Sequence, residues 1–168
     1  MRFKLDSHKW IFDDKKHLGF VSINTYTDEN LLSEFEVIES IKQGLLIDGH
    51  FGREIEISTL STSVYGAINL DELEKSDFAE CDNNQLEDYY IKYWSDKNWG
   101  ADLEVFKRHK KLVDNYLKEI NFHSNNHFFI CQEWLSKDKY VNLNFFAYLV
   151  FVLSISSNKI AVITYGED

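Results

Sequence analysis

Two histidines, His123 and His127, have the spacing of a metal site in this chain of 168 residues. Histidines four residues apart on one face of a helix bind zinc in motifs of the HExxH type. The residues between them, 124–126, read Ser-Asn-Asn, a sequence typical of turns, and include no glutamate. We therefore expect both histidines to lie in a surface loop without a metal ion.

The two cysteines, Cys81 and Cys131, are candidates for a nucleophile or a disulfide. They lie far apart and form no CxxC motif, so we expect two reduced thiols in a cytoplasmic protein. Cys131 follows Phe128, Phe129 and Ile130 on an apolar run. This predicts a place in the core, where burial raises the pKa of a thiol and makes it less reactive. A disulfide or a reactive thiol is the alternative.

The chain contains no GxGxxG, GxxxxGK[ST] or GxSxG motif, and its seven glycines are scattered. Paired carboxylates can carry out hydrolysis, but with 28 acidic residues no particular pair is indicated. We therefore predict no catalytic residues, no metal and no cofactor. The alternative is a small hydrolase or nuclease that uses carboxylates or His123 and His127 in a cleft.

Acidic and aromatic residues concentrate in the segment 71–104. Eleven acidic residues against three lysines give it a net charge of −8, compared with −10 for the whole chain. Trp and Tyr dominate the energetics of protein interfaces, and the charges around them set association rate and partner choice. The predicted partner-binding residues are Asp77, Glu80, Asp82, Glu87, Asp88, Tyr90, Tyr93, Asp96 and Trp99. The alternative is a solvated acidic loop followed by a helix whose aromatic residues belong to the core.

The net charge of −10 restricts the kinds of partner. Nucleic acids and anionic membranes are bound through clustered Lys and Arg, so we expect neither. The only basic cluster lies in residues 107–111, and we expect it to pair with the acidic segment that precedes it. A basic protein is the partner that this charge favours, and no small-molecule substrate is expected.

The N-terminal residues lack the apolar segment of a signal peptide, which predicts a cytoplasmic protein. The longest apolar run, 145–153, is too short to span a bilayer and predicts a strand in the centre of a sheet. The chain has no proline and no obvious linker, so we expect one domain over residues 1–168.

Apolar periodicity predicts helices over residues 30–43, 86–94 and 102–120. Runs rich in β-branched and aromatic residues predict strands over 10–12, 18–26, 54–59, 64–70, 128–135, 145–155 and 159–165. Segment 71–85 has no sustained period and is expected to be a long loop with one helical turn at 71–75. This order predicts an α+β fold, a mostly antiparallel sheet of about six or seven strands packed with two or three helices.

The helix predicted over 30–43 has recognisable ends. Ser33 and Glu36 have the spacing of a capping box, and Gly44 is placed to end the helix. Its apolar positions recur at helical spacing at Leu31, Phe35, Ile38 and Ile41. Residues 34–37 also alternate like a strand, which is the alternative.

In its overall make-up the chain resembles bacterial toxin-immunity proteins, such as those of contact-dependent growth inhibition and other polymorphic toxin systems. The resemblance rests on small size, acidity, many Tyr and Trp, and the absence of a catalytic motif. The residues that carry it are the acids of 71–104, the C-terminal residues 163–168, and Tyr89, Tyr90, Tyr93, Trp94 and Trp99. It implies one-to-one binding of a cognate toxin domain, often a basic nuclease, whose active site or substrate surface is blocked. An ordinary domain that oligomerises through its Trp and Tyr surface is a further alternative.

Overall fold

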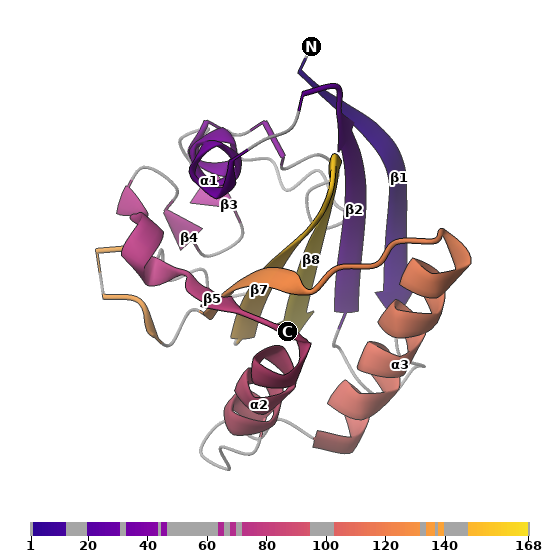
Figure 1. Cartoon of the computed structure of the whole chain (residues 1–168). Coiled ribbons are helices and arrows are strands. Elements are labelled where there is room, and N and C mark those ends of the chain that lie inside the picture. Colours follow the sequence, from indigo (N-terminus) through magenta and orange to yellow (C-terminus); the bar gives the residue numbers. More distant parts are fainter. Residues whose placement is uncertain are drawn as a thin grey trace.

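The fold is an antiparallel sheet with helices on both faces, as a computed structural model of the chain shows (Figure 1). The structure describes residues 2–12, 20–30, 33–43, 45–46, 64–65, 68–69, 72–94, 103–131, 134–136, 138–139 and 148–167. The main sheet has six strands in the order β1-β2-β8-β7-β6-β5, and β3 and β4 form a separate two-stranded sheet. Three α-helices accompany them. The predicted α+β class is confirmed.

The main sheet consists of β1 (Phe3–Phe12), β2 (Phe20–Asp28), β5 (Ala79–Cys81), β6 (Asn126–Cys131), β7 (Tyr148–Ser156) and β8 (Lys159–Glu167). The other elements are α1 (Glu34–Lys42), β3 (Val64–Tyr65), β4 (Ile68–Asn69), a 3-10 helix (Lys75–Asp77), α2 (Asn83–Trp94) and α3 (Leu103–Glu119). The pairs β1-β2 and β7-β8 join strands that lie close together in the chain. Such local pairs form at a low entropic cost, because the loop to be closed is short.

Both faces of the sheet are covered, and alternate residues of β6 and β8 belong to different cores. On β8, Ile160 and Val162 pack in the core that contains residues of α1, whereas Ala161, Ile163 and Tyr165 pack in the core of α2 and α3. Figure 1 shows α1 on one side of the sheet and the pair α2 and α3 on the other. The neighbouring strand β7 lies inside the sheet, and its described residues Val152 and Leu153 are buried on opposite faces, as the apolar sequence predicts.

Helix α1 begins at the predicted capping box. The Ser33 hydroxyl accepts a hydrogen bond from the Glu36 amide at 3.4 Å, and the Glu36 carboxylate accepts one from the Ser33 amide at 3.0 Å. The buried face of the helix carries Val37, Ile38 and Ile41. Phe35, which was predicted to belong to this face, is 57% exposed. The prediction was wrong because the buried stripe also includes Val37, which turns the centre of the stripe away from Phe35 and leaves that residue beyond its edge.

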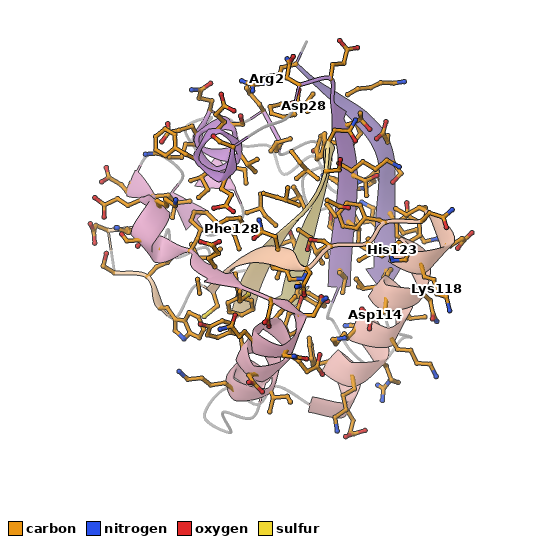
Figure 2. The ribbon with its side chains drawn as sticks, in the orientation of Figure 1. Arg2, Asp28, Asp114, Lys118, His123 and Phe128 are labelled. Carbon is orange, nitrogen blue, oxygen red and sulfur yellow. The ribbon has the colours of Figure 1, made fainter. Side chains whose placement is uncertain are left out.

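The end of strand β2 carries a buried carboxylate, Asp28, close to the N-terminus of the chain. The Arg2 guanidinium lies 3.7 Å from this carboxylate and 3.4 Å from that of Glu36 (Figure 2). A buried carboxylate is costly without a counter-charge. Arg2 therefore ties the start of β1 to the end of β2 and to α1.

The segment 71–85 is not the open loop that the sequence indicated. Ala79–Cys81 is the edge strand β5, and α2 begins at Asn83 instead of at residue 86. The Asp82 carboxylate accepts hydrogen bonds from the backbone amides of Asn84 and Gln85 at 2.9 Å each. The Gln85 side-chain oxygen accepts a hydrogen bond from the Asp82 amide at 3.0 Å. This is a second capping box, with aspartate as the N-cap. A three-residue strand is too short to show a period, so only its pairing with β6 reveals it.

Other element bounds also differ from prediction. Strand β1 extends back to Phe3, and β6 runs over Asn126–Cys131, so that Trp134 and Leu135 lie beyond it. The strand expected over 64–70 is instead the hairpin of β3 and β4. The strand expected over 54–59 and residues 145–147 lie outside the described residues. Among the described helices none is long and apolar enough to cross a membrane.

Candidate functional site

The predicted partner-binding residues do not form one surface, because the edge of the sheet divides them. Glu80 of β5 pairs with Phe128 of β6, and Phe128 packs on the α1 side. Residues directly opposite in a sheet point to the same face, so Glu80 also lies on the α1 side. Glu87 and Asp88 lie on α2, which covers the opposite face. Asp96 and Trp99 lie outside the described residues, and so does the side chain of Tyr93.

Tyr90 was predicted to contact a partner, and the structure shows that this was wrong. It is 3% exposed, and its ring lies 5.0 Å from that of Phe106 and 5.5 Å from that of Tyr165. Burial raises the pKa of Tyr90 well above its usual value. The ring fills the core between α2, α3 and β8.

Most acids of the segment 72–94 already have a partner. The Lys139 ammonium lies 2.9 Å from the carboxylate of Asp77 and 3.1 Å from that of Glu74. Asp82 caps α2, as described above. Apart from Asp82, the carboxylates that form no ion pair with another described residue belong to Glu72, Glu80 and Asp88, all of which are exposed.

The outer face of α2 combines an unpaired acid with exposed apolar groups. Asp88 lies near Ile91, which is 46% exposed, and the Lys92 ammonium lies 5.4 Å from the ring centre of Trp134. Trp134 is 40% exposed and rests on Tyr89 and Phe129 beneath it. We call Asp88, Ile91, Lys92 and Trp134 the α2 surface.

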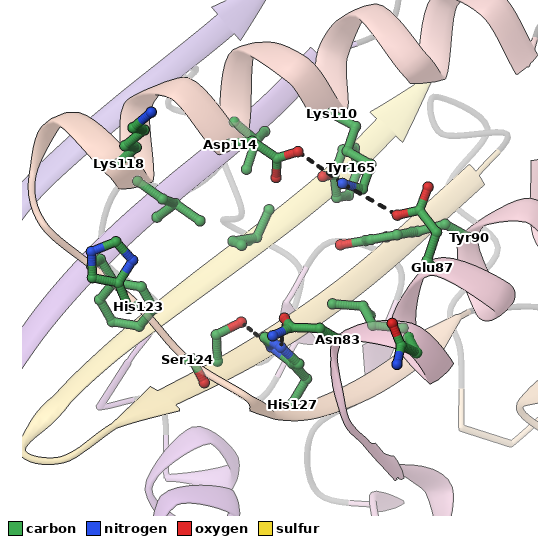
Figure 3. A pocket seen from close by; sticks show the side chains of 17 residues that line it. Asn83, Glu87, Tyr90, Lys110, Asp114, Lys118, His123, Ser124, His127 and Tyr165 are labelled. Carbon is green, nitrogen blue, oxygen red and sulfur yellow. Dashed lines mark hydrogen bonds and ion pairs between the residues drawn. The ribbon is translucent and has the colours of Figure 1, made fainter.

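A cleft of about 640 Å³ opens between α2 and α3, on the other side of α2 from Trp134. Its walls are the first half of α2 and the second half of α3, and its floor comes from β6, β7 and β8 (Figure 3). Val113, Leu117, Phe122 and Ile163 give it apolar walls and an apolar floor. Both histidines whose spacing first indicated a metal site line this cleft.

Three charged side chains bridge α2 and α3 across the cleft. The Lys110 ammonium lies 2.8 Å from the Asp114 carboxylate and 3.2 Å from that of Glu87 (Figure 3). Partial burial disfavours the charge of Lys110, but the two carboxylates outweigh this effect and raise its pKa. Lys107 pairs with Glu104 at 2.8 Å. For Lys107 and Lys110 the prediction that the basic cluster pairs with the acidic segment is therefore confirmed.

His127 was predicted to lie in a surface loop, and it is buried instead, with 5% of its surface exposed. Its Nδ1 lies 2.7 Å from the Ser154 hydroxyl and its Nε2 lies 2.8 Å from Oδ1 of Asn83. The Asn83 amide group donates to Asn125, so its oxygen accepts from His127. Nε2 therefore carries the proton, and Ser154 donates to Nδ1.

The prediction for His127 failed because β6 begins one residue before it, at Asn126. The alternation of His127, Phe129 and Cys131, which all point to the α2 side, was the signal that would have placed this histidine in a strand. His123 is exposed, as predicted. It lies near Lys118 at the end of α3 (Figure 2).

The burial of His127 predicts a loss of stability in mild acid. Burial lowers its pKa below the usual 6.5, and the charge of Asp82 offsets this only in part. The unfolded chain therefore takes up a proton near pH 6.5, whereas the folded protein takes it up only at lower pH. The stabilisation is complete above pH 6.5 and decreases as the pH falls toward the folded-state pKa.

Urea unfolding of the wild type and of His127→Gln, measured between pH 7.5 and 5, tests this. The wild type should lose up to about 1.4 kcal/mol per pH unit more than the variant in this range. Parallel curves for the two proteins would show that His127 is not the group that titrates.

Both cysteines are free and buried, and the prediction that Cys131 belongs to the core is confirmed. Burial raises the pKa of the Cys81 thiol to about 11, with the acids on either side adding to the effect. A thiol of this pKa is almost entirely protonated at neutral pH and is a poor nucleophile. Within the described part of the chain no three His, Cys, Asp or Glu side chains converge to hold a metal ion.

The polar groups on the cleft floor are occupied with one another. The Ser154 hydroxyl and the Asn83 oxygen hold both ring nitrogens of His127, and the Ser124 hydroxyl donates to the carbonyl oxygen of Ile155 at 2.6 Å. These bonds join the start of α2 to β6 and β7. These hydrogen bonds fix the position of the cleft walls. The exposed charged groups of the cleft, such as Glu87 and Asp114, lie at its mouth.

Comparison with known proteins provides no relative. No family model matches the chain, and no curated protein or solved structure is a match for it.

Proposed function

We propose that this protein is a binding protein of the immunity type, which neutralises a basic toxin domain through the α2 surface. The observation that carries the proposal is the exposed carboxylate of Asp88, which forms no ion pair with another described residue, beside the exposed side chains of Ile91 and Trp134. Interfaces draw most of their energy from a few aromatic and large apolar side chains within a polar rim. The α2 surface has this composition.

The charge of the protein as a whole favours a basic partner. Lys110 is balanced by two carboxylates, whereas Lys92 keeps its charge over the ring of Trp134 and offsets that of Asp88. The negative potential therefore comes from the whole chain, whose net charge is −10. A potential of this kind steers a basic partner during association and repels acidic proteins.

The proposal implies a heterodimer with one cognate toxin domain, in the cytoplasm, where buried thiols such as Cys81 and Cys131 stay reduced. It requires no catalytic group of the protein's own. Binding alone blocks the active site or the substrate surface of the toxin.

A small hydrolase is the second candidate, because His123, His127, Glu87 and Asp114 do line one cleft. The geometry favours it less than binding, since both nitrogens of His127 are held by Ser154 and Asn83. A general base needs a nitrogen within reach of the substrate proton. Hydrolysis of a nucleic acid or glycoside by the wild type, lost in His127→Gln at a pH where that variant is folded, would support the enzyme.

The binding proposal is tested by two charge reversals on opposite faces of the sheet. Asp88→Lys lies on the α2 surface, and Glu80→Lys, its matched control, changes an acid that is also exposed but lies on the α1 side. The tagged wild type is first purified from its native host, and a basic protein that co-purifies in a 1:1 ratio is identified by mass spectrometry. Sedimentation of the wild type alone distinguishes this result from self-association.

We expect Asp88→Lys to slow association with this partner on the order of tenfold at low salt, and Glu80→Lys to have a much smaller effect. Surface plasmon resonance at two salt concentrations measures both rates. Equal effects of the two reversals would mean that only net charge matters, and a larger effect of Glu80→Lys would move the interface to the α1 side.

A further inference from the structure

We propose that the cleft between α2 and α3 receives an arginine side chain of the protein partner, which takes the place of Lys110 between Glu87 and Asp114. The inference rests on the proposed function, since it assigns a second part of the same interface. It adds a pocket for one anchoring residue to the exposed α2 surface.

The cleft is placed to take part in that interface. Glu87 at its mouth directly precedes Asp88 on α2, and Ile91 follows one helical turn after Glu87. A partner that lies across the outer face of α2 therefore reaches the cleft on one flank and Trp134 on the other. Anchoring residues of interfaces typically enter such pockets, where they are shielded from water.

The position between Glu87 and Asp114 already accommodates a cation. The Lys110 ammonium lies within 3.2 Å of both carboxylates, although these belong to different helices. Glu87 and Asp114 are about half exposed, so a group from outside can reach both. A guanidinium group presents several N–H donors in one plane and can bond two carboxylates at once, which an ammonium does less well.

The shape of the cleft suits the rest of an arginine side chain. Val113 and Leu117 of α3 form one wall, and Phe122 and Ile163 extend the apolar surface toward the floor. The three methylene groups of arginine pack on such surface while the charged end stays at the mouth. The floor offers no competing charge, because His127 is neutral near pH 7 and hydrogen-bonded on both sides.

The remaining charged groups of the cleft argue for one cation and against an acidic occupant at this position. Lys118 and His123 lie together at the opposite end, beyond Asp114 (Figure 3). The Lys118 ammonium would repel a second basic side chain and would attract an anion only to that end. An acidic side chain at the Glu87 end would meet two carboxylates.

Titration with a small arginine probe tests the inference without the partner. Nα-acetyl-L-arginine N-methylamide is added to the ¹⁵N-labelled protein, and amide shifts are followed by NMR. We expect saturable shifts at residues of α2 and α3 that line the cleft. Glu87→Gln with Asp114→Asn keeps the shape of both side chains but removes their charge and replaces an acceptor oxygen with a donor, and it should weaken binding by about tenfold or more. Glu80→Gln, on the other face of the sheet, should leave binding unchanged.

Lys110→Gln distinguishes a site that exchanges its cation from an ion pair that is only structural. Removing the internal cation should tighten binding of the arginine probe by about threefold to tenfold, because the probe no longer competes with Lys110. If the amide spectrum shows that this variant is folded, weaker or unchanged binding of the probe would refute the proposal that arginine replaces Lys110. If this variant does not fold, the comparison of the double variant with the wild type decides alone.

Two further probes exclude other occupants. The citrulline analogue has the same shape without the charge, and equal binding of it would overturn the role of the carboxylates. Shifts at Lys118 and His123 with Nα-acetyl-L-glutamate N-methylamide, and none with the arginine probe, would make the cleft an anion site. A partner that binds normally to the double variant would refute the cleft proposal alone, whereas arginine binding with no basic partner in the host would refute the proposed function alone.

Discussion

Phe129→Ala is expected to lower the free energy of unfolding by about 3–5 kcal/mol, a large part of the stability of a domain of this size. Phe129 is completely buried on the α2 side of β6. Its ring stacks on that of Tyr89 at 5.3 Å and lies 5.2 Å from that of Trp134 and 5.8 Å from that of Tyr90. Truncation removes these contacts and leaves a cavity that the rigid sheet cannot close.

Phe35→Ala is the matched control, because the same side chain is deleted from an exposed position on α1. It should change stability by less than about 1 kcal/mol. Guanidinium unfolding of both variants, followed by tryptophan fluorescence and far-UV circular dichroism, gives the two values. Similar losses at the two positions would contradict the placement of Phe129 at the centre of this core.

The Phe129 cluster also connects the fold to the proposed binding surface. Tyr89 and Trp134 rest on Phe129, and Lys92 lies over Trp134. The exposed part of the α2 surface is therefore held by a buried ring. A substitution of Phe129 that weakens its contact with Trp134 should also weaken partner binding, because Trp134 loses its fixed orientation, even where the variant remains folded.

Features that depend on near neighbours in the chain were predictable from the sequence. The capping box of Ser33 and Glu36, helix α3 and the hairpin of β7 and β8 each depend on residues a few positions apart. The two-sided burial of β7 follows from its apolar sequence for the same reason. These features suffice to give the α+β class.

Features that depend on distant pairing were not predictable. The edge strand β5 exists because it pairs with β6, where Cys81 lies opposite His127, 46 residues later in the chain. In the sequence Ala79–Cys81 is only three residues long and contains Glu80, so it shows no strand pattern. His127 was misplaced by one position, since a strand that begins at Asn126 directs this side chain into the core.

The cleft gives no signal in the sequence, because its lining comes from two helices, one loop and three strands. Glu87 and Asp114 are 27 residues apart, and only the packing of α2 against α3 brings them to one lysine. The acidic composition correctly indicated where charge accumulates. It gave no information on which acids form ion pairs within the fold. Asp77 and Glu87 each pair with a lysine, whereas Asp88 pairs with no other described residue.

Tyr90 is the residue that best tests where the core ends and the contact surface begins. Two substitutions of this residue should have very different effects on the free energy of unfolding. Tyr90→Ala is expected to lower the free energy of unfolding by about 3–5 kcal/mol, because the ring is packed between Phe106, Tyr165 and Phe129. Tyr90→Phe removes only the hydroxyl, which shares a hydrogen bond with Tyr165, and should lower it by about 1 kcal/mol.

The affinity for the partner gives the decisive comparison for Tyr90. The ring of Tyr90 lines the cleft, but its hydroxyl is buried and shares a hydrogen bond with Tyr165. Tyr90→Phe should therefore bind the partner nearly as tightly as the wild type, whereas Asp88→Lys binds more slowly at nearly unchanged stability. Calorimetry on the folded proteins measures the affinities, and urea unfolding measures the stabilities. Tight binding by the wild type together with a tenfold loss in Tyr90→Phe would return Tyr90 to the interface. Unchanged binding would assign the aromatic side of α2 to the core and leave its outer face, with the adjoining cleft, as the surface available to a partner.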